Sequence, residues 1–191
     1  MADHYFVVNC EDPDDGYLAR LSYTPDDPRR SWILGERFEA PPPLPVRATA
    51  RGLDDEDTVL AELWKSPLPA MSKRLHAVLV EAGVSNLDAY PLEIADPSSG
   101  EVLHDHVAFN LIGKVAAVDL TASVMAATNT DKMVSASFDQ LALDEQRIGG
   151  ALMFRLAESV STIIVHRSVK ERIESAGIRT LTFYVPQDWT T

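Results

Sequence analysis

The sequence predicts an α+β fold: a mostly antiparallel sheet and two main helices in a single compact domain. Short β-branched and aromatic runs alternate with turns rich in Pro, Asp and Gly, which is typical of strands. Two segments instead space their apolar residues as one face of a helix. The chain has 191 residues, 46% hydrophobic and 24% charged, which suits one globular domain and argues against wholesale disorder.

Short strands separated by turns are predicted for the N-terminal third. Tyr5–Val8 is a β-type run that ends in the turn at 11–16, and 17–23 alternates weakly. Pro41–Pro45 must be extended, because proline fixes φ and disfavours the α conformation before it. We interpret this segment as a connector to a strand at 46–50; a polyproline ligand for an adaptor domain is the alternative.

The first main helix is predicted over about 70–82. Ser72 is a candidate N-cap and Gly83 can supply the left-handed residue that follows the helix. The apolar residues that share one face are Met71, Leu75, Val78, Leu79 and Ala82.

The second main helix is predicted over about 168–176. Ser168 and Glu171 have the spacing of a capping box, and Gly177 is placed to end the helix. Gly149-Gly150 is interpreted as a turn between two strands. Residues 107–113 and 115–119 are expected to form two buried strands or one bent strand. The further strands expected after the first helix lie at about 87–94, 137–144, 152–156, 162–165 and 181–185.

The chain is acidic, with 29 Asp and Glu against 17 Lys and Arg and a net charge of −12. Residues 1–66 carry 14 acidic and seven basic side chains. We therefore expect a looser, acidic N-terminal lobe at 1–66 ahead of a better-packed core at 67–191, both able to belong to one domain. This charge argues against binding to nucleic acid or to an anionic membrane surface.

The acidic residues of this lobe are clustered at 11–12, 14–15, 26–27 and 54–57. Like charges so close together belong on solvated turns. One interpretation is solubility alone, and the other is an acidic face that attracts and docks a basic partner.

His104 and His106 are the residues that most suggest a metal site. Alternate residues of a strand share a face, so both rings could reach one ion. No third ligand stands at a typical spacing, so no metal or cofactor is predicted, and a small metal-dependent hydrolase is kept as the alternative function.

No catalytic constellation stands out elsewhere. Cys10 and His4 could act as a nucleophile and its base, although Cys10 fits better as a small buried residue. Asp119 and Asp139 could act as acids or bases, but a hydrogen bond to a turn or a pair with Arg155 is the simpler expectation.

A cytoplasmic location is expected. No apolar run approaches the roughly 20 residues of a membrane helix, and the first ten residues do not have the pattern of a signal peptide. The single Cys10 fits a reducing compartment.

The order of motifs after residue 66 resembles the eleventh numbered family of immunity proteins from bacterial polymorphic-toxin systems. This family was first described as a domain of unknown function and is abundant in myxobacteria. Arg179-Thr180 departs from it, since similar proteins often have a glycine before the final strand. The motifs are Pro67–Ser72, Val84–Leu92, Phe109–Ile112, Ala117–Leu120 with Ser123, Met153–Leu156, Ile163–Val165, Ala176–Ile178 and Leu181–Phe183.

The resemblance implies a protein that is not an enzyme and that binds and neutralises a cognate toxin, encoded by a neighbouring gene. If the toxin is a nuclease, an acidic inhibitor could occupy its basic cleft. The contact surface we predict is Asp54, Asp55, Glu56 and Asp57, with Trp32 or Trp64 as an apolar anchor. The sequence leaves the oligomeric state open.

Overall fold

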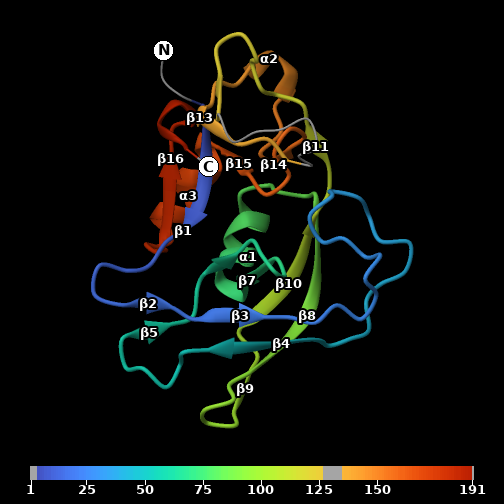
Figure 1. Cartoon of the computed structure of the whole chain (residues 1–191), viewed down its shortest axis with the longest axis vertical. Coiled ribbons are helices and arrows are strands. Elements are labelled where there is room, and N and C mark those ends of the chain that lie inside the picture. The colour runs from blue at the N-terminus through green and yellow to red at the C-terminus, as the bar shows by residue number, and fades with distance from the viewer. Residues whose placement is uncertain (1–3, 127–134, 191) are drawn as a thin grey trace.

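The computed structural model describes residues 4–126 and 135–190, and it contains two larger β-sheets that pack around shared helices (Figure 1). The first sheet has five strands, and its neighbours are antiparallel except for the β11–β14 pair. Their order across the sheet is β11 (Lys114–Val115), β14 (Met153–Leu156), β15 (Ile163–His166), β1 (Tyr5–Cys10) and β16 (Leu181–Tyr184).

The second sheet has seven strands, and the only parallel pair in it is β4–β8. Two small two-stranded sheets join β2 (Tyr17–Leu18) to β5 (Thr58–Val59) and β12 (Val124–Met125) to β13 (Phe138–Gln140). The large sheet runs β3 (Arg20–Ser22), β4 (Val46–Arg51), β8 (Leu87–Ala95), β10 (His106–Leu111), β7 (Ala70–Ser72) and β6 (Leu63–Trp64), with β9 (Val102–Leu103) on β8. The α+β prediction is confirmed.

The first predicted helix is α1, Lys73–Glu81. Its N-cap is Ser72 as predicted, and the side chain of Ser72 accepts a hydrogen bond from the backbone N of Leu75. The prediction placed the start of the helix too early, because Ala70–Ser72 pairs with β10 and β6 as a strand. Gly83 follows the helix with φ of 91°.

The second predicted helix is α3, Arg167–Ser175, and its predicted cap was wrong. His166 is the N-cap, and its ring accepts from the backbone N of Ser168. Strand β15 runs up to His166 and turns directly into the helix, so Ser168 already lies inside the first turn. Gly149-Gly150 also differs from the prediction, because it links the short helix α2 (Glu145–Ile148) to β14 rather than two strands.

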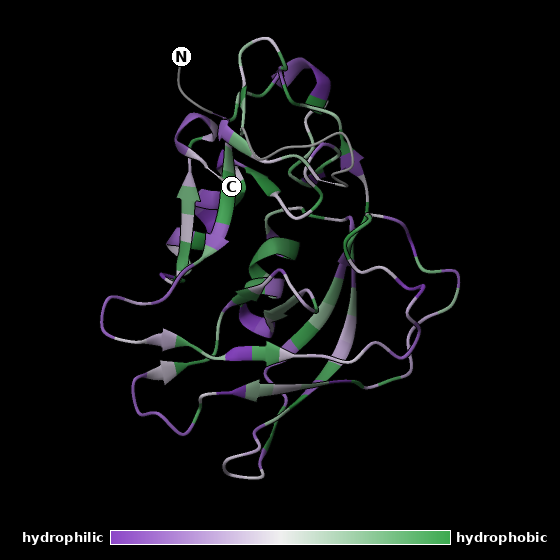
Figure 2. Ribbon diagram, in the orientation of Figure 1, coloured by the Kyte–Doolittle hydropathy of each residue, from purple (hydrophilic) through white to green (hydrophobic). Residues whose placement is uncertain are grey.

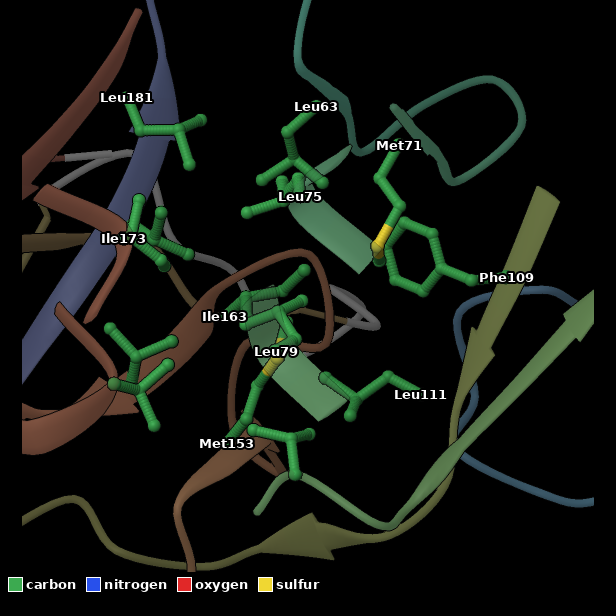
Figure 3. Close-up of a cluster of buried hydrophobic side chains, with 14 of the residues drawn as sticks. Leu63, Met71, Leu75, Leu79, Phe109, Leu111, Met153, Ile163, Ile173 and Leu181 are labelled. Carbon is green, nitrogen blue, oxygen red and sulfur yellow. The ribbon is translucent and has the colours of Figure 1, made fainter. Parts of the chain in front are cut away.

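The main core lies between the two large sheets and helices α1 and α3 (Figure 3). Leu75 and Leu79 are the buried residues of α1, and Val169 and Ile173 are those of α3. Figure 2 shows hydrophobic residues along many of the strands and hydrophilic residues along several of the outer loops. A 3₁₀ turn at Pro186–Asp188 is the last element of the described chain. No helix of the described residues is long and apolar enough to cross a membrane.

The first 66 residues share both large sheets with the remainder of the chain. Strand β1 lies between β15 and β16, and β4 lies beside β8. Pro41–Pro45 leads into β4 and forms neither a helix nor a strand, which fits the connector interpretation.

Candidate functional site

Two acidic turns that are distant in the sequence lie side by side in the structure (Figure 1). The turn at 11–15 precedes β2, and the turn at 54–57 precedes β5. The parallel β2–β5 pair brings them together, and the backbone N of Tyr17 donates to the carbonyl of Asp57 over 3.0 Å. We call their exposed carboxylates the acidic edge: Asp12, Asp14, Asp15, Asp54, Asp55, Glu56 and Asp57.

Backbone hydrogen bonds hold the second turn in shape. The backbone N of Asp55 donates to the carbonyl of Gly52 over 3.0 Å, and the backbone N of Thr58 donates to the carbonyl of Asp55 over 3.0 Å. The carboxylate of Asp55 also accepts from the backbone N of Asp57 at 3.1 Å. The predicted residues Asp54, Asp55, Glu56 and Asp57 therefore sit on an ordered turn with their side chains in solvent.

Gly16 lets the two acidic turns touch. A Cβ atom at this position would lie 2.1 Å from the carbonyl oxygen of Asp57, which no side chain could accept without a backbone shift. Within the first turn, the carboxylate of Asp12 accepts a hydrogen bond from the backbone N of Leu18 at 2.7 Å. The spacing of the two turns is thus fixed by backbone contacts.

The seven carboxylates of the acidic edge form no ion pair with any Lys, Arg or His of the described chain. The acidic pair at 26–27 behaves differently, since Asp26 pairs with Arg30 and Asp27 pairs with Arg29 at 3.0 Å. The Arg29 hydrogen bond lowers the pKa of Asp27 to about 2. The carboxylates of the acidic edge therefore repel one another, and only solvent, salt or a cationic partner can reduce this repulsion.

Glu11 is next to the acidic edge in sequence but has a structural role. Its carboxylate accepts from the hydroxyls of Tyr184 and of Thr182, the latter at 3.1 Å, and from Asn9 Nδ2 at 3.3 Å. The hydrogen bond from Tyr184 is the main cause that lowers the pKa of Glu11. Glu11 thereby anchors the first acidic turn to the end of β16.

The two tryptophans predicted as anchors are buried, with Trp32 4% and Trp64 8% exposed. The indole N of Trp64 donates to the carbonyl of Ala19 over 3.0 Å. Most of the surface of both rings is therefore covered by the protein itself. Trp32 packs edge-on against Tyr23, Phe38 and Tyr90.

The exposed apolar residues at the acidic edge are Tyr17 and Val59, 62% and 44% exposed. They belong to β2 and β5, the strands that follow the two acidic turns. Sequence reasoning missed them, because neither stands out until the β2–β5 pairing is known.

His104 and His106 line the same pocket but differ in burial. His106 is buried, its Nε2 lies 2.9 Å from the carbonyl oxygen of Ala61, and burial lowers its pKa. His104 is exposed and outside any strand. A search of the described residues found no group of three or more His, Cys, Asp or Glu that could hold a metal ion.

The other chemical candidates are also separated. His4 precedes β1 and lies 2.8 Å from Glu145, whereas Cys10 ends the same strand and has its pKa raised by burial. The carboxylate of Asp119 accepts from the backbone N and the hydroxyl of Thr121, so the turn explanation is confirmed.

The other alternative, an ion pair of Arg155 with Asp119 or Asp139, does not form among the described residues. Arg155 is fully buried, donates from Nη1 to the carbonyl of Val160 over 2.9 Å and has no carboxylate partner among the described residues. Burial lowers its pKa to about 10.

A comparison with known proteins identifies the family. No curated protein sequence matches the chain. The sequence model described as the immunity protein family Imm11 matches residues 17–188, which includes both β2 and the second acidic turn. Because this match spans nearly all of the 191 residues, the chain belongs to the Imm11 immunity protein family.

Proposed function

We propose that this protein is a non-enzymatic inhibitor that binds a cognate toxin through the acidic edge. Membership of the immunity family supports a role in protection against toxins. The observation that carries the choice of surface is the set of seven exposed carboxylates without an internal cation, held on two turns in backbone contact.

The chemistry of this surface fits a basic partner. An enzyme that acts on nucleic acid needs a basic substrate cleft, because much of its binding energy comes from phosphate contacts. Carboxylates on an ordered frame can occupy such a cleft in place of phosphates. We therefore favour a nuclease toxin, made from a neighbouring gene and neutralised in the cytoplasm.

The experiment is a binding titration between this protein and the product of the adjacent reading frame, inactivated by mutation. It is done at about 50 mM and about 500 mM salt, where the Debye length falls from more than 10 Å to less than 5 Å. We expect tight binding that weakens steeply with salt, mainly through slower association. Tight binding whose affinity is the same at both salt concentrations would contradict the acidic edge as the contact surface. No binding at either salt concentration would contradict the pairing with that neighbour.

A further inference from the structure

A groove of about 580 Å³ lies beside the acidic edge, where the end of β1 meets β2, β3 and β6. Its floor includes the apolar side chains of Leu18, Leu21, Leu63 and Trp64. Arg20 and Lys65 also line it, and we call it the cationic groove. Asp12 belongs to both surfaces, so a single partner could cover the acidic edge and the groove together.

Lys65 is a half-buried cation without an anionic partner in contact. It forms no ion pair with a described carboxylate, and its recorded contact is the ring of Trp189, 5.5 Å from Nζ to the ring centroid. Burial and the charge of Arg155 lower the pKa of Lys65, against smaller opposing interactions with Cys10 and with the carboxylate of Glu11, which forms no ion pair with it. A desolvated ammonium next to a second cation is stabilised by an anion that enters the groove.

Arg20 lies at a position where its charge does not stabilise the folded chain. In the β3–β4 ladder it stands directly opposite Arg51, and both side chains are exposed and without an ion pair in the described chain. Like charges directly opposite each other on neighbouring strands are destabilising. Such an arrangement fits a residue whose counter-charge arrives with a partner.

We propose that the cationic groove receives a carboxylate side chain of the same toxin that the acidic edge binds, carried on an apolar segment. Lys65 and Arg20 hold the carboxylate, and the leucines and Trp64 cover the apolar side chains beside it. This inference rests on the proposed function and explains how the protein would select one toxin among many. A basic cleft alone would accept many acidic surfaces, whereas neighbouring patches of opposite sign fix one register and reject other partners.

The test measures affinity and dissociation rate for the inactivated product of the adjacent reading frame. Lys65→Met removes the charge and nearly keeps the length of the side chain. Arg20→Gln removes the charge with a shorter polar side chain, at a position that is exposed. We expect each to weaken binding about tenfold, mostly through faster dissociation. Lys65→Arg should retain most of the affinity, because the charge remains.

The matched control is Lys170→Met. Its ammonium also lies over aromatic rings, those of Phe6 and Phe183, but on α3 and outside the groove. It should bind like the wild type. If the Lys65 and Arg20 variants bind like this control while reversal of the acidic edge weakens binding, the groove proposal is overturned and the proposed function stands. If Lys65→Arg binds the toxin as weakly as Lys65→Met, the contact of Lys65 with a carboxylate is overturned. If the wild-type protein does not bind, both proposals are overturned.

Discussion

Single residues fix the position of the acidic edge. Gly16 is needed where one acidic turn touches the other, and Glu11 ties the first turn to β16 through Tyr184 and Thr182. Neither role is visible in the sequence, because both depend on residues that the fold brings from far along the chain.

Gly16→Ala should destabilise the protein by about 1–3 kcal/mol, since the new Cβ would overlap the carbonyl oxygen of Asp57. Urea unfolding measures the change. Gly100→Ala is the control: its Cβ would meet nothing within 4 Å, so it reports only the cost of its positive φ of 77°. A Gly16 variant no less stable than the Gly100 variant would contradict the contact.

Glu11 should contribute stability that depends on pH. Its pKa is lowered in the folded state, so the contribution is present above the unfolded value of about 4.3 and is lost as the pH falls through the folded value. The difference in free energy of unfolding between the wild type and Glu11→Gln should therefore shrink on acidification below about pH 4. Asp14→Asn is the control for the loss of one surface charge, because the Asp14 carboxylate accepts no hydrogen bond within the described chain. A Glu11→Gln difference that does not shrink on acidification would refute the anchor.

At the scale of elements, the helices were predictable and their boundaries were not. The apolar spacing of Leu75, Leu79, Val169 and Ile173 depends only on local periodicity, which the sequence displays. Ala70–Ser72 became a strand because β10 and β6 offer backbone partners on both sides. Such pairings join distant segments and leave no local signal.

The cap of α3 gives a test of this kind. His166→Ala should cost about 0.5–2 kcal/mol, because it removes the acceptor for the backbone N of Ser168, whereas His166→Asn should restore most of the loss. Glu171→Ala should change stability by less than about 0.5 kcal/mol, since Glu171 does not reach back to the cap. Thermal or urea unfolding compares the stability of the three variants. If Glu171→Ala destabilises the protein as much as His166→Ala, the capping box would be supported after all.

At the scale of the whole molecule, the fold class, the family and the exposed second acidic turn could be predicted from the sequence. The partner of that turn could not, because the β2–β5 pair joins residues 17–18 to residues 58–59 without a sequence signature. The burial of Trp32 and Trp64 was also hidden, since a large aromatic residue suits a core and an interface equally well.

The central claim is that the acidic edge is the surface through which this immunity protein binds its toxin. The direct measurement is the affinity of D54K/D55K/E56K/D57K for the inactivated product of the adjacent reading frame. The control E39K/E81K/E101K/E171K makes the same change in net charge at exposed positions that form no ion pair with another described residue.

We predict that the first variant loses at least about tenfold in affinity while the control loses much less. The milder D54N/D55N/E56Q/D57N should fall between the wild type and the full reversal, and circular dichroism verifies that each variant is folded. A folded D54K/D55K/E56K/D57K chain that binds as tightly as the wild type would contradict the account.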